Sequence, residues 1–216
     1  MNEARRAAGW IKICGMTTPE AVDAALAARV DAIGFVFSPS PRQLTPESAA
    51  RLAAPARGRA LCVAVTRHPG QALLDEIVAR FAPDLWQSDR EDIDGLHAPQ
   101  SLAVLPVLRS GGGAPAALPP RLLYEGPVSG AGEVCDWSSA RGLARRTELI
   151  LAGGLDASSV GAAIAAVEPF GVDVSSGVEA RPGIKSAEKI VRFAEAARTA
   201  FGERHDARVF KQEIST

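Results

Sequence analysis

Two clusters of small residues late in the chain stand where backbone groups could bind an anion. Gly153-Gly154 and Ser175–Gly177 each follow an apolar run, and a helical pattern lies between the two clusters. Because glycine has no side chain, backbone amides at such turns can approach an anion closely. Two adjacent turns of this kind are typical of the phosphate site of a (β/α)8 barrel. We therefore expect Gly153, Gly154, Ser176 and Gly177 to bind phosphate; the alternative is that they only form tight turns.

A cysteine follows the first apolar run and offers different chemistry. Trp10–Cys14 (WIKIC) reads as a strand, and Gly15 comes directly after the thiol. A thiol with an ordinary pKa of about 8.5 must be tuned before it can act as a base near neutrality. The start of a predicted helix at Thr17–Glu20 lies close enough to lower this pKa. A cysteine among apolar residues can also be a small buried hydrophobe.

Other polar residues recur where predicted strands end, and in a barrel the carboxyl ends of the strands face the active site. Taken in chain order, these positions hold Cys14, Arg42, Gln87, Arg109, Glu125, Gly153-Gly154 and Asp173–Gly177. The set combines a nucleophilic or basic thiol, a guanidinium group, a carboxylate and a phosphate cradle. It contains no metal-ligand cluster and no Ser/His/Asp arrangement, so the sequence predicts no bound metal.

Apolar, β-branched runs alternate with helical patterns along the chain, which indicates a parallel sheet. The predicted strands are residues 10–14, 31–37, 60–65, 84–87, 103–108, 121–125, 149–152 and 172–174. The predicted helices are residues 19–29, 46–54, 70–81, 137–146, 157–167 and 186–200. Eight strands favour a closed (β/α)8 TIM barrel. A doubly wound open sheet, the alternative, would carry a G-x-G-x-x-G loop after its first strand, and none is present there.

One connection departs from the alternation of strands and helices. Residues 109–120 (RSGGGAPAALPP) contain three glycines and three prolines, which leave little room for a helix. The fifth helix of the barrel is therefore predicted to be short or missing. We expect a single barrel domain over residues 1–201, followed by a polar tail over residues 202–216.

Composition narrows the classes of function. The 216 residues are 47% hydrophobic and 23% charged, with a formal net charge of −1, which does not favour binding to nucleic acid or to an anionic membrane. No apolar run approaches the roughly 20 residues that span a bilayer. The three cysteines have no metal-like spacing, and the N-terminus has no secretory pattern, so we expect a cytoplasmic protein. The sequence leaves open whether the protein is a monomer or a homodimer.

Four segments carry a resemblance to a known family. They are KICGMTTPE (Lys12–Glu20), DAIGFVFSPSPRQLTPE (Asp31–Glu47), ILAGGLD (Ile150–Asp156) and GVDVSSGVEARPGIK (Gly171–Lys185). In this order they resemble phosphoribosylanthranilate isomerase of tryptophan biosynthesis, over about residues 11–197. The resemblance implies a (β/α)8 barrel that binds a small phosphorylated substrate. It also implies an Amadori rearrangement of N-(5-phosphoribosyl)anthranilate to 1-(2-carboxyphenylamino)-1-deoxyribulose 5-phosphate, without a cofactor.

The resemblance also implies roles for individual residues. Cys14 stands at the family's general base. Arg42 matches an arginine that contacts the anthranilate carboxylate, for which a planar guanidinium is well suited. Asp173 matches a residue that contacts the ribose-derived hydroxyls, although a buried aspartate that only hydrogen-bonds loop amides is an alternative. Gln87 matches the first residue of the family's Q-L-H-G-D-E motif, which reads QSDRED here.

The sequence also departs from the family pattern at the position of the general acid. The family places an aspartate at the end of the sixth strand, before a glycine-rich loop and an F-D-W-S motif. This chain reads LLYEGPVSGAGEVCDWS (Leu122–Ser138), so Glu125 occupies the acid's position. We assign the general acid to Glu125 rather than to Asp136, whose place before a predicted helix also suits an N-cap.

Two other functions remain in competition. A catalytically impaired barrel that still binds phosphorylated ligands would explain the Asp-to-Glu change and the altered fourth strand. Another sugar-phosphate barrel enzyme, such as an aldolase-type lyase, would need a Schiff-base lysine at a strand end. Lys12 lies within a predicted strand and Lys185 lies beyond the last one, so the sequence does not favour the lyase.

Overall fold

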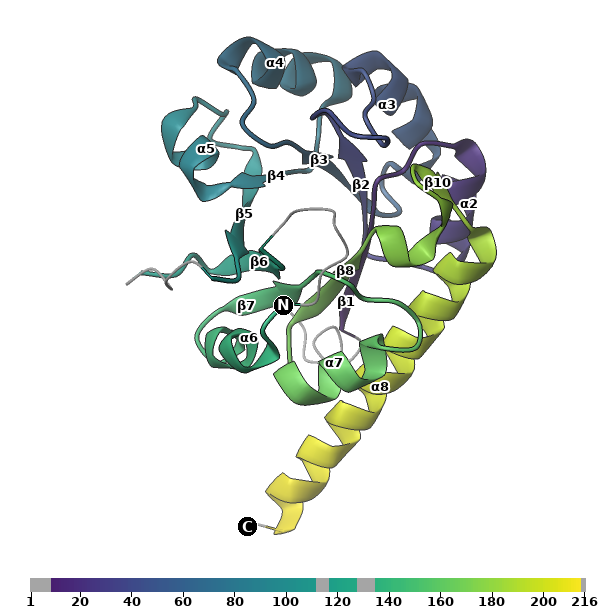
Figure 1. The fold of residues 1–216 in the computed structure, drawn as a ribbon, viewed down its shortest axis with the longest axis vertical. Coiled ribbons are helices and arrows are strands. Elements are labelled where there is room, and N and C mark those ends of the chain that lie inside the picture. The colour runs from purple at the N-terminus through teal and green to yellow at the C-terminus, as the bar shows by residue number, and fades with distance from the viewer. Residues whose placement is uncertain (1–8, 112–116, 128–134, 215–216) are drawn as a thin grey trace.

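Eight parallel strands form a closed barrel in the order of the sequence (Figure 1). The computed structural model describes residues 9–111, 117–127 and 135–214, with the backbone alone for residues 206–214. The barrel closes because β1 pairs with β2 on one side and with β8 on the other. The predicted TIM barrel is therefore confirmed, and the open doubly wound sheet is excluded.

The strands match the sequence prediction closely. They are β1 (Trp10–Cys14), β2 (Ala32–Val36), β3 (Leu61–Val65), β4 (Leu85–Asp89), β5 (Ala103–Arg109), β6 (Arg121–Glu125), β7 (Glu148–Leu151) and β8 (Gly171–Val174). Beyond the barrel, β9 (Glu179–Arg181) and β10 (Ile184–Lys185) form a small antiparallel hairpin.

Helices follow most strands and cover the outside of the barrel. The α-helices are α2 (Pro19–Ala27), α3 (Pro46–Ala53), α4 (Gln71–Glu76), α5 (Arg90–Gly95), α6 (Trp137–Ala144), α7 (Val160–Val167) and α8 (Ala187–Ile214). Short 3-10 turns occupy Ala54–Ala56 and Ser176–Val178, and Ile77–Phe81 forms a π-helical turn. Thr18 and Thr45 cap α2 and α3 through their hydroxyls, with proline at the first helical position of each.

The fourth strand is longer than predicted. The sequence predicts a strand that ends at Gln87 and a polar stretch after it, whereas β4 continues through Asp89 and α5 follows directly. Ser88 and Asp89 are polar yet buried, because Ser88 hydrogen-bonds to Thr66 and Asp89 pairs with Arg109. The strand therefore extends into the predicted polar stretch, because these polar side chains find buried partners.

The end of the chain also differs from the prediction. The last helix was expected to end at Ala200, yet the backbone of α8 is helical through Ile214 and includes most of the stretch predicted as a tail. Glu, Arg, Ala, Lys and Gln dominate this stretch, and these residues have high helix propensity. Of the predicted helix-poor connection between β5 and β6, residues 112–116 lie outside the described residues, and 110–111 and 117–120 are not helical.

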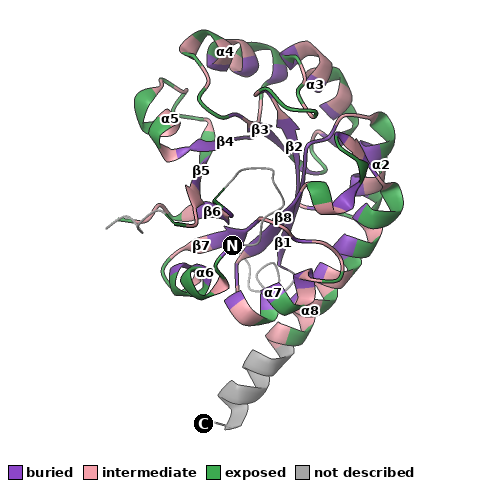
Figure 2. Ribbon diagram, in the orientation of Figure 1, coloured by how far each residue is buried: buried purple, intermediate pink, exposed green. Residues whose placement is uncertain are grey.

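Two apolar layers hold the barrel together. One lies between the strands and the helices, so the strands are largely buried and the helices expose their outer faces (Figure 2). The other lies inside the barrel toward the amino ends of the strands, where Trp10, Ala32, Val63, Leu85, Leu105, Leu123 and Ile150 meet. Since side chains alternate along a strand, the residue two positions after each of these also faces inward. Several of those positions are polar, and they form the other end of the barrel.

Among the described residues, no helix combines the length and apolar character that crossing a membrane requires.

Candidate active site

The carboxyl ends of the strands surround a pocket of about 180 Å³. Five residues to which the sequence assigns a role line it: Cys14, Arg42, Gln87, Glu125 and Asp173. Arg109, which the sequence places at a strand end without a role, lines it too. A smaller cavity of about 50 Å³ is lined by Gly153-Gly154 and Ser176. Glu125, Asp173 and Ser175 belong to the walls of both cavities, so the two form one continuous site.

Cys14 ends β1 in a closely packed environment. A methyl group at Gly34 of β2 would come within 2.9 Å of the Cys14 sulfur, so only glycine leaves room for the thiol. Burial raises the pKa of the Cys14 thiol above its ordinary value; the charge of Asp173 acts in the same direction, and Lys12 and Lys185 oppose it. The helix start that the sequence predicts to help lower this pKa does not bring it below the ordinary value, because burial outweighs the favourable charges.

Lys12 lies two residues before Cys14 on the same face of β1, fully buried inside the barrel. Its Nζ donates to Oδ1 of Asp173 at 2.9 Å, across the junction of the first and last strands. Burial alone would lower the pKa of Lys12, but Asp173 and the Cys14 sulfur raise it above its ordinary value. Lys12 is thus a buried cation, and Asp173 commits one carboxylate oxygen to it.

Glu125 ends β6 and is held by the neighbouring strand. The Nη2 of Arg109 lies 3.0 Å from Oε1 of Glu125, and its Nη1 lies 2.5 Å from Oδ1 of Asp89. Arg109 and Glu125 are register partners on β5 and β6, which places the guanidinium beside the carboxylate. Arg109 therefore bridges two carboxylates at the pocket wall, and Glu125 is positioned rather than free.

Asp136 has a different environment. It is exposed, and its Oδ1 accepts a hydrogen bond from the backbone N–H of Ser138 at 2.9 Å, while Oδ2 accepts one from the Ser139 hydroxyl at 2.5 Å. These bonds hold the pKa of Asp136 below its usual range. The structure thus places Asp136 as the N-cap of α6 and not among the residues that line the pocket.

Arg42 enters the pocket from the loop after β2. It donates from Nε and Nη2 to the two carboxylate oxygens of Glu179, at 2.6 and 2.9 Å. Lys185 donates to the same Glu179 at 2.9 Å and to the carbonyl of Ser175 at 2.9 Å. Burial raises the pKa of Glu179, but its hydrogen bonds to Arg42 and Lys185 outweigh this and lower it. The hairpin of β9 and β10 therefore fixes both Arg42 and the turn after β8.

The two turns of small residues pack against each other. Gly153 and Gly154 have positive φ angles of 91° and 64°, which glycine adopts without strain. At Gly177 a methyl group would lie 2.0 Å from the carbonyl oxygen of Leu155. The sequence therefore needs glycine at these positions so that the two backbones can approach.

Within the described residues, two buried polar atoms of the pocket lining have no hydrogen-bond partner. They are Oε1 of Gln87 and Nε of Arg109. A buried polar group without a partner costs on the order of 1–3 kcal/mol, so such atoms call for an explanation. An acceptor and a donor left unpaired in one pocket are suited to a polar ligand.

A group of residues with metal-binding chemistry lies at the pocket rim. Ligand atoms of His68, Asp89 and Asp92 fall within 4.8 Å of one another. However, Asp89 is already paired with Arg109, and Oδ2 of Asp92 accepts hydrogen bonds from the Ser88 hydroxyl and the His68 backbone. A cation at this place would meet the positive charge of Arg109, so the arrangement favours an ion-pair network.

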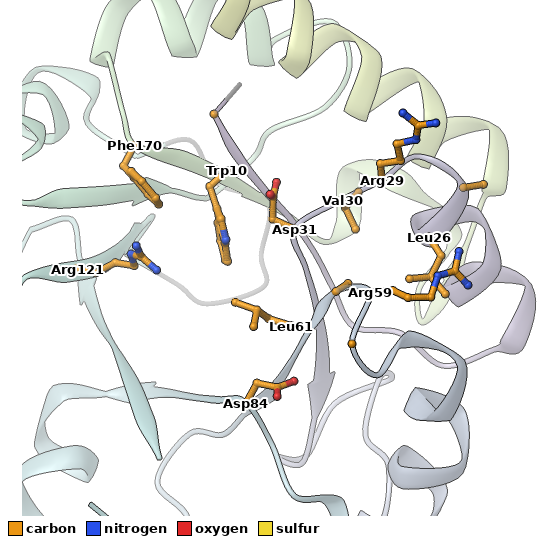
Figure 3. A pocket seen from close by; sticks show the side chains of 14 residues that line it. Trp10, Leu26, Arg29, Val30, Asp31, Arg59, Leu61, Asp84, Arg121 and Phe170 are labelled. Carbon is orange, nitrogen blue, oxygen red and sulfur yellow. The ribbon is translucent and has the colours of Figure 1, made fainter. Parts of the chain in front are cut away.

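A larger cavity, of about 730 Å³, opens at the amino ends of the strands (Figure 3). Trp10, Leu61, Arg121 and Phe170 border it, and none of the sequence-predicted site residues does. Arg121 stacks over the ring of Phe170 at 4.5 Å and is paired with Glu148. The larger cavity therefore lies at the end of the barrel opposite the pocket.

Sequence reasoning missed four charged residues of the site. Lys12, Asp89, Glu179 and Lys185 are all buried. Lys12 and Asp89 each had a usable signal, since each lies two residues from a predicted site residue, Cys14 or Gln87, on the same strand face. Glu179 and Lys185 had no such signal, because their places depend on a hairpin that the sequence did not indicate.

The sequence is similar to one family of barrel enzymes. Residues 116–196 match the family model described as N-(5'phosphoribosyl)anthranilate (PRA) isomerase. An N-(5'-phosphoribosyl)anthranilate isomerase from Azorhizobium caulinodans is 38% identical over 94% of this chain and 97% of its own. One from Mesorhizobium japonicum is 36% identical over 90% and 97%.

Two solved structures share the fold over most of both chains. Phosphoribosyl anthranilate isomerase from Thermus thermophilus aligns with a TM-score of 0.76 at 26% identity, over 88% of this chain and 98% of its own. TrpF from Jonesia denitrificans aligns with a TM-score of 0.71 at 34% identity, over 89% and 98%.

A closed parallel barrel with a polar pocket at the carboxyl ends of its strands defines a protein of the (β/α)8-barrel enzyme class. The sequence identity of 36–38% to these relatives over nearly the full length identifies the family within this class. The chain belongs to the N-(5'-phosphoribosyl)anthranilate isomerase family and is an isomerase of tryptophan biosynthesis.

Proposed function

We propose that the chain converts N-(5-phosphoribosyl)anthranilate into 1-(2-carboxyphenylamino)-1-deoxyribulose 5-phosphate, with Glu125 as general acid and Cys14 as general base. The observation that carries this proposal is that both side chains line one pocket, together with Arg42, Asp173 and the cavity at the glycine turns. One related barrel was crystallised with reduced 1-(o-carboxyphenylamino)-1-deoxyribulose 5-phosphate, which is consistent with such a substrate.

The reaction proceeds by successive proton transfers, with no change of oxidation state overall. Glu125 donates a proton to the furanose ring oxygen; the C1–O bond breaks, and the nitrogen lone pair forms the C1=N bond of a protonated Schiff base. The Cys14 thiolate then removes the proton from C2. The electrons of that C–H bond form a C1=C2 bond while the C1=N electrons return to nitrogen, which gives an enolamine. C1 then takes up a proton and the C2 hydroxyl loses one, which gives the ketone. Acid and base positioned in this way typically contribute about 10²–10⁴-fold each.

The two ends of the substrate carry negative charge and need separate binding sites. We assign the anthranilate carboxylate to Arg42, which Glu179 holds in place through two hydrogen bonds. We assign the phosphate to the backbone at Gly153, Gly154, Ser176 and Gly177; the first three line the smaller cavity, and Gly177 packs against the turn that contains Leu155. Gln87 offers an unpaired acceptor in the pocket that Arg42 also lines.

The assignment of the acid can be tested against Asp136. Freshly generated phosphoribosylanthranilate is fluorescent, and its loss of fluorescence measures turnover. We expect Glu125→Gln to lower turnover by about 10²–10⁴-fold and Asp136→Asn to change it little, because asparagine also caps a helix. The reverse ranking would transfer the role to Asp136.

A catalytically impaired barrel is the second candidate, and one observation favours it: Glu125 is longer than the aspartate of the family pattern and is paired with Arg109. The same assay on the wild-type protein separates the two. A rate no faster than in buffer would establish the impaired barrel and overturn the isomerase mechanism.

A further inference from the structure

Charged groups surround the Cys14 sulfur on several sides. Lys12 on β1, Asp173 on β8 and Lys185 on β10 each interact with it electrostatically, as does Arg42 from the loop after β2. Three of these four groups are cations. Burial disfavours the negatively charged thiolate of Cys14, whereas these nearby cations favour it.

The two lysines differ in how their N–H groups are used. Lys185 donates to the carbonyl and hydroxyl of Ser175 and to Glu179, at 2.9, 3.2 and 2.9 Å, which accounts for the three donors of an ammonium group. Lys12 donates to Asp173 at 2.9 Å, and its charge also interacts with the side chain of Cys14. Of the two lysines, Lys12 acts more strongly on the thiol.

The packing over Gly34 places the two side chains next to each other. A methyl group at Gly34 would lie 2.9 Å from the Cys14 sulfur and 3.2 Å from Cε of Lys12. The side chains of Cys14 and Lys12 thus occupy the space that any side chain at position 34 would need. Lys12 and Cys14 are held together by the strand face that they share and by the missing side chain opposite them.

We propose that the buried ammonium group of Lys12, anchored by Asp173, is a positioning residue that stabilises the thiolate form of Cys14. This inference rests on the proposed role of Cys14 as general base. Cys14 releases its proton to solvent, Lys12 keeps its own, and the resulting ion pair replaces a neutral thiol in a buried site. Asp173 prevents Lys12 from losing its charge, at the cost of opposing the thiolate itself.

The pH dependence of alkylation by iodoacetamide measures the thiolate directly and does not depend on turnover. Each cysteine peptide is quantified by mass spectrometry in the wild type and in Lys12→Met. We expect the midpoint for Cys14 to move at least one pH unit upward, so that alkylation below it is about tenfold slower. Cys62 and Cys135 are buried and serve as internal controls, because rapid labelling of either would report unfolding.

A second variant covers the case in which Lys12→Met does not fold because Asp173 is left as an unpaired buried charge. Lys12→Met/Asp173→Asn removes both charges at once. Lys12 affects Cys14 more strongly than Asp173 does, so the midpoint should still lie above that of the wild type. An unchanged or lower midpoint in a folded Lys12 variant would overturn the proposal, and a purely structural Lys12 would give that result.

Failure of the proposed function would look different. If Cys14→Ser kept normal turnover, Cys14 would not be the base, but the alkylation midpoints would still show whether Lys12 stabilises its thiolate.

Discussion

The two ends of the barrel use charged residues in opposite ways. At the amino ends of the strands, Asp31 accepts hydrogen bonds from the backbone N–H of Ile11 at 2.9 Å and from Arg198 at 2.8 Å. Asp84 accepts one from the backbone N–H of Cys62 at 2.8 Å. Each of these carboxylates ties one strand to the start of the next. At the carboxyl ends, the charged residues bind one another and leave a donor and an acceptor unpaired.

The difference shows that cavity size is a poor guide to function in this molecule. The cavity of about 730 Å³ at the amino ends has walls whose carboxylates bind backbone and arginine groups of the fold. The pocket of about 180 Å³ at the carboxyl ends is lined by a buried thiol, which interacts with two buried lysines behind the lining, and by unpaired polar atoms. Changes at the first end should therefore affect stability, and changes at the second should affect turnover.

The largest effect should come from the thiol at the carboxyl end. We expect Cys14→Ser to lower turnover by about 10²–10⁴-fold, because a hydroxyl is a far weaker acid than a thiol and cannot supply the basic anion. The fluorescence assay measures this, and thermal unfolding should show a folded protein. Cys62→Ala, on β3 and away from the pocket, is the matched control and should keep wild-type turnover. If the turnover of Cys14→Ser stayed within tenfold of the wild type, Cys14 would have no more of a catalytic role than Cys62.

The next effect concerns the glycine turns. Gly177→Ala should raise KM by about tenfold or more, because a methyl group 2.0 Å from the carbonyl oxygen of Leu155 forces the two turns apart. Gly161→Ala, inside α7 with open space around it, is the control and should stabilise the protein by about 1 kcal/mol with unchanged KM. Steady-state kinetics on both variants measures KM. Equal KM values would show that the glycine turns do not take part in substrate binding.

A change at the amino end should have the reverse signature. Asp31→Ala removes the acceptor for a backbone N–H and for Arg198, and we expect it to lower the free energy of unfolding by about 1–3 kcal/mol. Its kcat/KM should equal that of the wild type. Urea unfolding and the fluorescence assay together test this, and a loss of turnover in a folded Asp31 variant would contradict the division between the two ends.

The smallest effect is a pH dependence of stability. Burial raises the pKa of the Cys62 thiol from 9.0 to about 11. The unfolded chain therefore releases this proton at lower pH than the folded chain, and the stabilising contribution present below pH 9.0 is lost as pH rises toward about 11. We expect urea midpoints to fall more steeply over this range in the wild type than in Cys62→Ala. If the urea midpoints of the two proteins fell equally steeply with pH, burial would not raise the pKa of Cys62.

The sequence predicted the barrel because its strands are short, apolar and separated by helical patterns. It also predicted five of the residues that line the pocket, since a residue such as Cys14 or Glu125 ends a strand at a recognisable place. It could not predict that Lys12 is buried, because a lysine between two isoleucines is equally compatible with an edge position. The partner that makes burial possible, Asp173, lies 161 residues away. Likewise, the pKa of Cys14 depends on how deeply the fold covers it, which no local pattern contains.

The contact between Lys12 and Asp173 joins the first strand of the barrel to the last. An ammonium group cannot be sealed inside an apolar cylinder before its counter-ion arrives, so this seam closes only when nearly the whole chain is in place. The surroundings that we assign to the Cys14 thiolate are consequently absent from any partly assembled barrel. The base that we propose therefore forms in the same event that completes the fold, so a chain that stops before β8 has the cysteine but lacks the charge balance around it.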